Sequence, residues 1–284
     1  MAIFSNQATL SYNGISTDSN IAYGEILDVL TATKTAVGGT YVPGELVTYA
    51  VALRSTGTGT LTGLTLTDDL GGYPYGGGTL YPLTYEEGSV ALFIDGVLQP
   101  APTVTAGPPL TVTGISIPAG SDAVLVYKAR TNQFADPAAG GTIVNTLTVT
   151  GPGINAPITA TETVTVRTGP DLSISKSISP AQVVDNDRVT YTFVIQNTGN
   201  APLVATDDAV ITDTFDPVLT DLTVTFNGTP WTQGIQYTYD PTTGAFATVA
   251  SNITVPAATF TQDPVTGAYT TTPGTATLTV TGTI

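Results

Sequence analysis

The sequence contains no cysteine and no histidine, and each absence removes a class of chemistry. Without cysteine there is no disulfide and no thiolate nucleophile, and the redox state of the compartment cannot be read from cysteine pairs. Without histidine, the Ser-His and Cys-His catalytic pairs and the His-ligated metal sites are also excluded. We therefore expect no enzyme beyond a self-modification reaction, and no cofactor or metal.

Positive charge and long apolar runs are also scarce. Seven Lys and Arg stand against 22 Asp and Glu, which gives a formal net charge of −15. This charge repels phosphate backbones and anionic lipid headgroups, so neither nucleic acid nor a membrane is an expected partner. The first residues, Met1–Ser5, lack the basic start and apolar run of a signal peptide. Either a leader has been removed, or the protein is made inside a cell and exposed by lysis.

The sequence is instead rich in the residues of an all-β surface protein. Thr and Val abound, 30 Gly and 20 Pro supply turns, and only 10% of the residues are charged. Apolar and polar residues alternate in many short stretches, whereas no long stretch repeats at the helical period. At 284 residues the chain suits two domains, each large enough for its own core. The predicted fold is two tandem β-sandwiches.

Comparison of the sequence with itself indicates an internal repeat. Thr33-Lys34-Thr35 matches Ser175-Lys176-Ser177, and Leu66-Thr67-Asp68 matches Ile211-Thr212-Asp213. The first copy continues with two predicted strands that the second copy lacks, Ile143 to Thr150 and Ile158 to Val166. We predict a donor hairpin over 1–28, a first domain over 29–168, and a second domain over 169–284 that lacks its last two strands.

The predicted donor hairpin resembles the hairpin that the second copy lacks. Its first strand, Phe4 to Tyr12, alternates like Ile143 to Thr150 and turns at Asn13-Gly14. The side chains predicted to enter a neighbour's core are Phe4, Asn6, Ala8, Leu10 and Tyr12. An unfinished sandwich and an isolated hairpin are each unstable, and each would complete the other. Head-to-tail exchange between copies, which does not close, predicts a filament made of this chain.

Several polar residues share the alternation parity of apolar neighbours and are therefore predicted to point inward. They are Lys34, Asp68 and Asn145 in the first domain, Lys176 and Asp213 in the second, and Asn6 in the hairpin. Burying such groups is costly unless they satisfy one another. Burial also favours the neutral forms, so that a lysine amine can attack an asparagine carboxamide while an aspartic acid shuttles protons. We expect isopeptide bonds Lys34–Asn145 within the chain and Lys176–Asn6 between chains, with Asp68 and Asp213 as the proton shuttles.

These residues carry a resemblance to known families. Both halves of the chain resemble the bacterial conserved-repeat surface domain. The resemblance rests on the lysine of the first strand, on Thr67-Asp68 and Thr212-Asp213, on the Pro-Ala segments at 118–119 and 256–257, and on the Asn before alternating Thr and Leu. That family has immunoglobulin-like architecture and no known function. The Lys/Asp/Asn set is similar to that of the self-crosslinking domains of Gram-positive adhesins and pili. The two-repeat layout resembles the endospore appendage subunits of anaerobic spore formers, which implies an extracellular, spore-surface or cell-surface location.

Alternative interpretations remain open at this point. Each Lys-Asp-Asn set can be a hydrogen-bonded ion pair in which no covalent bond forms. The chain can also be an adhesin that recognises a glycan or a host protein through Trp231 and the Tyr73-Pro74-Tyr75 loop, although lone aromatics usually fill cores. Acidic pairs such as Asp207-Asp208 lack the spacing of a calcium loop. The sequence leaves open whether an anchoring protein holds the base of the filament.

Overall fold

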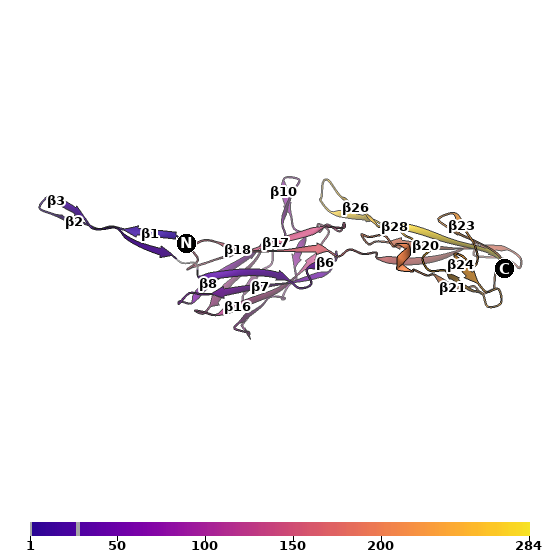
Figure 1. Cartoon of the computed structure of the whole chain (residues 1–284), viewed down its shortest axis with the longest axis horizontal. Coiled ribbons are helices and arrows are strands. Elements are labelled where there is room, and N and C mark those ends of the chain that lie inside the picture. Colours follow the sequence, from indigo (N-terminus) through magenta and orange to yellow (C-terminus); the bar gives the residue numbers. More distant parts are fainter. Residues whose placement is uncertain (1, 27–28) are drawn as a thin grey trace. The chain divides into compact units, whose positions relative to one another are not determined.

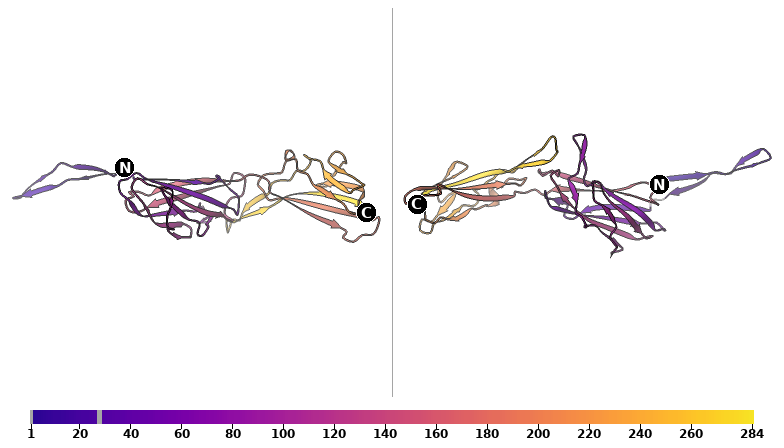
Figure 2. Two further views of the ribbon diagram at one scale, coloured as in Figure 1. Left: turned by 90° about the horizontal axis from the view of Figure 1, so that it is seen from below. Right: turned by 180° about the vertical axis from the view of Figure 1, so that it is seen from behind.

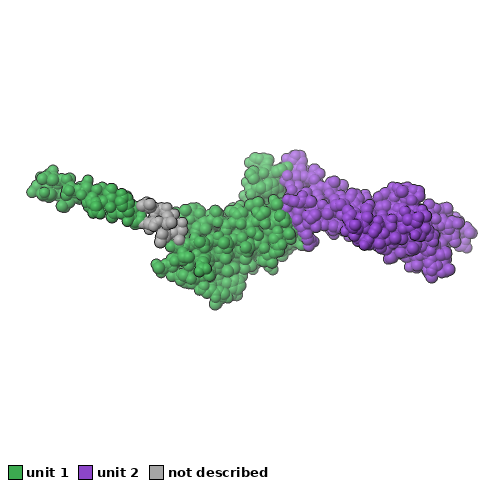
Figure 3. Space-filling model, viewed as in Figure 1, with its two compact units in different colours: residues 1–135, 142–165 green, residues 136–141, 166–284 purple. Residues whose placement is uncertain are grey.

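A computed structural model describes residues 2–26 and 29–284, and nearly all of its regular structure is β-strand. Among these residues the one helical element is a single 3-10 turn, η1 (Ala205–Asp207), and no helix has the length and apolar character to cross a membrane. The chain separates into two compact units (Figure 3). Unit 1 comprises residues 1–135 and 142–165, and unit 2 comprises residues 136–141 and 166–284.

The N-terminal segment forms two short antiparallel ribbons (Figures 1 and 2). β1 (Ala2–Asn6) pairs with β4 (Ala22–Ile26), and β2 (Thr9–Tyr12) pairs with β3 (Ile15–Asp18). The turn falls at Asn13-Gly14 as predicted, and both residues have positive φ. The predicted end of the hairpin, at residue 28, lies outside the described residues.

The prediction of one continuous strand from Phe4 to Tyr12 was wrong. The ladder is interrupted between β1 and β2, because the backbone N–H of Ala8 bonds the Ser19 hydroxyl at 3.0 Å instead of a strand partner. The Ser19 N–H in turn donates to the Ala8 carbonyl at 2.8 Å. Residues 4–23 are all exposed, so each ribbon is a two-stranded structure without a core.

Unit 1 is a β-sandwich of two antiparallel sheets. The first sheet runs β13 (Val97–Leu98), β12 (Ala91–Ile94), β16 (Asp122–Thr131), β7 (Leu46–Ser55), β5 (Leu30–Ala36), with β11 (Leu83–Tyr85) also on β16. The second sheet runs β14 (Thr103–Thr105), β15 (Leu110–Ile117), β8 (Leu61–Asp68), β17 (Thr142–Thr150), β18 (Ile158–Val166), β6 (Thr40–Tyr41). β9 (Tyr73–Tyr75) and β10 (Gly78–Leu80) form a separate hairpin.

Alternation places the core of unit 1 between the two sheets. In β17, Ile143, Asn145, Leu147 and Val149 are buried, as their shared parity predicted. Val47, Tyr49, Val51 and Leu53 of β7 are buried from the opposite sheet. All three polar side chains of the predicted reaction set, Lys34, Asp68 and Asn145, are therefore buried in a mainly apolar core.

Unit 2 begins with a sheet in the order β19 (Leu172–Ser179), β20 (Arg188–Asn197), β28 (Gly274–Thr283), β22 (Thr220–Phe226), β23 (Thr229–Trp231). This order parallels β5, β7, β16, β12 and β13 of unit 1, and the β22–β23 turn at Asn227-Gly228 matches the β12–β13 turn at Asp95-Gly96. The remaining strands are β21 (Thr212–Thr214), β25 (Ala245–Thr248) and β24 (Tyr237–Tyr239) in one sheet, and β26 (Thr259–Gln262) with β27 (Tyr269–Thr272) in a hairpin.

The second sheet of unit 2 is narrower than that of unit 1. In unit 1, β8 lies between β15 and β17. In unit 2, the matching strand β21 pairs with β25 on one side, and no described strand pairs with its other edge. β19 is exposed along its whole length, including Leu172, Ile174 and Ile178, whereas Leu30 and Lys34 of β5 are buried. The core of unit 2 is open where β17 and β18 cover the core of unit 1.

Candidate functional site

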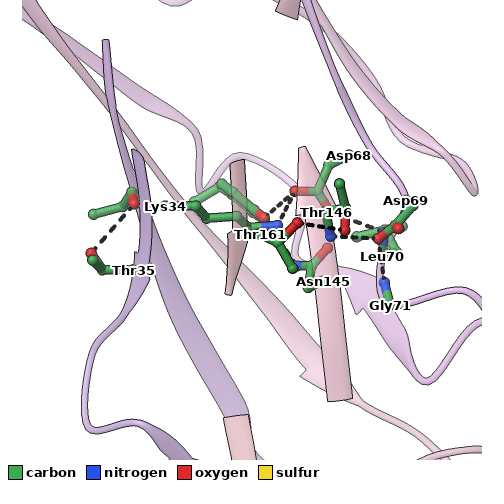
Figure 4. A network of polar contacts seen from close by, with 11 residues as sticks. Lys34, Thr35, Asp68, Asp69, Leu70, Gly71, Asn145, Thr146 and Thr161 are labelled. Atoms are coloured by element: carbon green, nitrogen blue, oxygen red, sulfur yellow. Dashed lines mark hydrogen bonds and ion pairs between the residues drawn. The ribbon is translucent and has the colours of Figure 1, made fainter. Parts of the chain in front are cut away.

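A buried ion pair joins the two sheets of unit 1. Lys34 of β5 places its Nζ 2.6 Å from Oδ2 of Asp68 at the end of β8, and the two side chains are 0% and 2% exposed. The strands belong to opposite sheets, so the pair spans the core. Figure 4 shows that Lys34, Asp68 and Asn145 point toward one another.

Two stacked tyrosine rings lie beside the amine. The Lys34 Nζ is 4.9 Å from the ring centroid of Tyr49 and 5.9 Å from that of Tyr127, and the two rings are 5.4 Å apart. Burial lowers the pKa of Lys34, while the charge of Asp68 and the hydrogen bond to it act in the opposite direction. The net shift favours the neutral amine, which is the form that can act as a nucleophile.

The Asp68 carboxylate accepts hydrogen bonds from three donors. Its Oδ2 accepts hydrogen bonds from Lys34 and from the Tyr127 hydroxyl at 2.5 Å, and its Oδ1 accepts one from the Leu70 N–H at 3.0 Å. Burial, followed by the charge of Asp68, raises the pKa of Tyr127 well above its usual value. The Tyr127 hydroxyl therefore stays protonated and donates a hydrogen bond to the carboxylate.

Asn145 completes the buried network from β17. Leu147 pairs with Asp68 across the β17–β8 ladder, which places Asn145 two residues farther along on the same face. The Asn145 Nδ2 donates to the Tyr127 hydroxyl at 3.2 Å. Its Oδ1 is buried without a hydrogen-bond partner, an arrangement that normally costs about 1–3 kcal/mol. The structure thus places an amine, a carboxylate and a carboxamide within one dry network, the set needed for amide exchange.

The sequence prediction did not include the two tyrosines of this network. Both have inward parity in strands rich in apolar residues, Tyr49 between Val47 and Val51 and Tyr127 after Leu125. That pattern was the available signal, and it is equally typical of ordinary core aromatics.

A second lysine–aspartate pair lies in unit 2, and it is not buried. Lys176 of β19 forms an ion pair with Asp213 of β21, and the side chains are 39% and 18% exposed. The Lys176 Nζ lies 4.6 Å from the ring centroid of Tyr191 and 5.4 Å from that of Phe215. Lys176 points inward, as its parity predicted, but in the single chain its side chain stays partly exposed. It faces the core aromatics, but no described strand covers it as β17 and β18 cover Lys34.

The three-stranded sheet that carries Asp213 lines a cavity. A cavity of about 470 Å³ is lined by all three residues of β21 and by parts of β24 and β25, including Tyr239 and Phe246. Within the described part of the chain, no side chain holds the place beside β21 that Asn145 holds beside β8.

The predicted donor residues remain exposed on the hairpin. Phe4, Leu10 and Tyr12 are 56%, 62% and 55% exposed, and Asn6 and Ala8 are also exposed. Ile15, Ile21 and Tyr23 add further exposed apolar surface to the same ribbons. The aromatic candidates for a binding site lie elsewhere: Trp231 stacks on Phe226 at 5.0 Å, and Tyr73 and Tyr75 form half-buried β9.

Comparison with known proteins gives matches to solved structures only. No family model matches the sequence, and no curated protein matches it. The chain is similar to the full-length major pilin SpaD of Corynebacterium diphtheriae, with 13% identity, a TM-score of 0.37, and coverage of 60% of this chain and 47% of that chain. The chain thus spans about half the length of that pilin.

Two further similar structures are pilus proteins of streptococci. The pilus backbone RrgB of Streptococcus pneumoniae shares 12% identity, with a TM-score of 0.36 and coverage of 86% of this chain and 55% of that chain. A 35 kDa C-terminal fragment of the major pilin GBS80 of Streptococcus agalactiae shares 13% identity, with a TM-score of 0.36 and coverage of 87% of this chain and 91% of that chain. At these identities and TM-scores, the similarities assign no function to the chain.

Proposed function

We propose that the chain is a structural subunit of an extracellular filament, in which the N-terminal hairpin of one copy completes unit 2 of the next. The observation that carries this proposal is the open Lys176–Asp213 site of unit 2, which has the first two members of the buried unit 1 network and lacks the third. A filament on a cell or spore surface is the setting that fits an acidic, all-β chain of this kind.

The hairpin carries the features that the open edge lacks. In unit 1, β17 inserts alternate side chains, Asn145 among them, and β18 pairs with it on the outer side. In the hairpin, the sequence from Phe4 to Leu10 has the same alternation, with Ala8 at the break between β1 and β2, and β4 and β3 pair with these strands. The corresponding inward residues are Phe4, Asn6, Ala8 and Leu10 for Ile143, Asn145, Leu147 and Val149.

Register supports Asn6 as the missing carboxamide. Leu147 pairs with Asp68 in unit 1, and Asn145 stands two residues before it. If Ala8 of a donor strand takes the same place opposite Asp213, then Asn6 stands two residues before it, beside Lys176. Docking buries exposed apolar side chains on both partners, at about 25 cal/mol per Å² of apolar surface, and adds backbone hydrogen bonds along β21.

The chemistry is the same at both sites. The lysine Nζ attacks the asparagine Cγ, a new C–N bond forms, and the bond between Cγ and Nδ2 breaks. Nζ loses two protons on going from ammonium to amide: one moves by way of the aspartate to Nδ2, which leaves as ammonia, and the other stays on the aspartate. Lys34 and Asn145 form the bond within unit 1, and Lys176 and Asn6 form it between copies, with Asp68 and Asp213 as proton carriers.

The test is resistance of the assembled protein to boiling detergent. Purified full-length protein is incubated at high concentration, boiled, and examined by denaturing gel and intact mass. We expect a ladder of multimers from the wild type, with one ammonia lost per bond, and a monomer from Asn6→Ala that has lost only the ammonia of unit 1. Asn20→Ala, which removes another exposed asparagine of the same hairpin, is the matched control and should keep the ladder.

Three outcomes would contradict the proposal. A ladder that survives in Asn6→Ala excludes Asn6 as the acceptor. A wild-type monomer that has lost two ammonia molecules shows closure within one chain, and a wild-type monomer of full mass shows that both sets are ion pairs only.

A surface binding module is the second candidate function. A cavity of about 440 Å³ in unit 1 is the observation that favours it, because Tyr81, Tyr85 and Phe134 line it together with aliphatic side chains. Binding of the wild-type monomer to a glycan array, abolished by Tyr85→Ala, would support this function. An array without a signal would leave the filament as the single candidate.

A further inference from the structure

The Tyr127 hydroxyl stands between the two groups that must exchange a proton in unit 1. It donates to Asp68 Oδ2 at 2.5 Å and accepts from Asn145 Nδ2 at 3.2 Å. Asn145 Nδ2 is the atom that leaves as ammonia in the proposed reaction. The Asn145 side chain makes this hydrogen bond deep in the core, where Tyr127 is 0% exposed, so water does not compete for its place.

We propose that Tyr127 is a catalytic residue of the unit 1 crosslink, whose hydroxyl carries a proton from Asp68 to the leaving nitrogen of Asn145. This inference rests on the proposed function, because it assigns a residue to the crosslinking reaction inferred for the same site.

The proton balance of the relay is complete without an outside group. Lys34 first gives one proton to Asp68 and attacks the Asn145 Cγ as a neutral amine. As Cγ becomes tetrahedral, Nδ2 gains a basic lone pair and reverses its hydrogen bond with Tyr127. The tyrosine hydroxyl then gives its proton to Nδ2 and takes one from Asp68 Oδ2. The C–Nδ2 bond breaks, ammonia leaves, and Nζ gives a second proton to Asp68, which ends protonated, so the net charge of the site is zero before and after the reaction.

The environment of Tyr127 suits a proton relay better than a general base. Burial and the neighbouring Asp68 both raise the pKa of its hydroxyl, so the group does not ionise and can pass a proton only while it receives another. Its stacked neighbour differs in this respect. Tyr49 is equally buried and its hydroxyl lies near the Asn145 side chain, but it makes no hydrogen bond to Asp68, so it does not connect the carboxylate to the leaving nitrogen.

The open site of unit 2 lacks the relay. Tyr49 pairs with Tyr127 across β7 and β16, and the matching pair across β20 and β28 is Tyr191 with Val280. Both Tyr49 and Tyr191 lie under their lysines, but a valine occupies the relay position in unit 2. Proton transfer in that site has to run directly from Asp213, so the relay is specific to the bond within the chain.

The test compares two single-hydroxyl deletions in the same pair of stacked rings. Wild type, Tyr127→Phe and Tyr49→Phe are synthesised in a cell-free system, stopped in hot detergent at successive times, and analysed by intact mass for the loss of ammonia. We expect Tyr127→Phe to slow the loss at unit 1 by about 100-fold or more, the usual contribution of general acid–base catalysis. Tyr49→Phe should react at the wild-type rate within about twofold, because the Tyr49 hydroxyl makes no hydrogen bond to Asp68 and so cannot pass its proton on.

A second measurement separates catalysis from folding. The wild-type rate is followed in mixtures of light and heavy water, where the concerted movement of two protons gives a curved dependence on deuterium fraction. Circular dichroism confirms that both variants are folded before their rates are compared. Equal rates for wild type and folded Tyr127→Phe, or a linear isotope dependence, would overturn the relay while leaving the crosslink intact. A wild type of full mass would overturn the crosslink and the relay together.

Discussion

Replacing Asn145 with alanine should lower the free energy of unfolding of unit 1 chiefly by removing the covalent crosslink to Lys34. A bond between Lys34 and Asn145 closes a loop of about 110 residues, and the chain-entropy model for crosslinks of this length gives about 4–5 kcal/mol. The side chain itself adds about 1 kcal/mol through its hydrogen bond to Tyr127. For a domain of this size, the sum corresponds to a fall in melting temperature on the order of 10–20 °C.

A double-mutant cycle isolates the covalent part. The same Asn145→Ala change is made in a Lys34→Met background, where no bond can form, so it then reports only the lost side-chain contacts. The assay is differential scanning calorimetry of the full chain, with the unit 1 transition identified as the one that Asn145→Ala moves. The effect of Asn145→Ala should be larger in the wild type than in Lys34→Met by about 4–5 kcal/mol.

Two results would refute this reasoning. If Asn145→Ala costs the same in both backgrounds, the bond makes no contribution to stability even where the mass shows that ammonia has been lost. If the wild type retains full mass and the two costs are still different, Lys34 and Asn145 are coupled by non-covalent contacts alone. Filament formation serves as the control, because Asn145 lies outside the hairpin and the open edge of unit 2.

Two further predictions concern the lysines. In Asn145→Ala, stability should rise with pH through the alkaline range below the ordinary lysine pKa of 10.5. Burial lowers the folded-state pKa of Lys34, so in this pH range the unfolded chain binds more protons at Lys34 than the folded chain does. Urea denaturation at several pH values should show the rise of the unfolding free energy with pH. Adding Lys34→Met should abolish this pH dependence. In unassembled protein, Lys176→Met should cost at most about 1 kcal/mol, because a half-exposed ion pair is screened by solvent. In the Asn145→Ala background, Lys34→Met should cost about 3–5 kcal/mol, because it leaves Asp68 buried without its cation. Equal losses of stability in Lys34→Met and Lys176→Met would show that the burial of Lys34 does not raise the cost of removing its charge.

Much of the fold follows from local alternation. The parity of β17 correctly placed Ile143, Asn145, Leu147 and Val149 in the core, and the Asn-Gly and Asp-Gly pairs marked hairpin turns whose residues have positive φ. Lys34 and Asp68 were expected to point inward and do so. These features were predictable because strand side chains alternate with a period of two and such turns need residues that tolerate positive φ.

The features that the sequence did not predict depended on neighbours distant in sequence. The break between β1 and β2 arises from a hydrogen bond between Ala8 and the Ser19 hydroxyl across the ribbon. Lys176 is exposed because no strand of the described residues pairs with the second edge of β21, since its own parity is that of Lys34. Neither can be read from the strand that carries the residue.

By itself the sequence determined which side chains face inward, because that depends only on the alternation along each strand. Only the tertiary structure decided which inward side chains meet. Tyr127 lies between Asp68 and Asn145 because β16 and the β8–β17 pair face each other from opposite sheets, and the open edge of unit 2 exists because β21 has a partner on one side. The physical reason is that contacts across a sandwich depend on the register and spacing of two sheets, which no single strand contains.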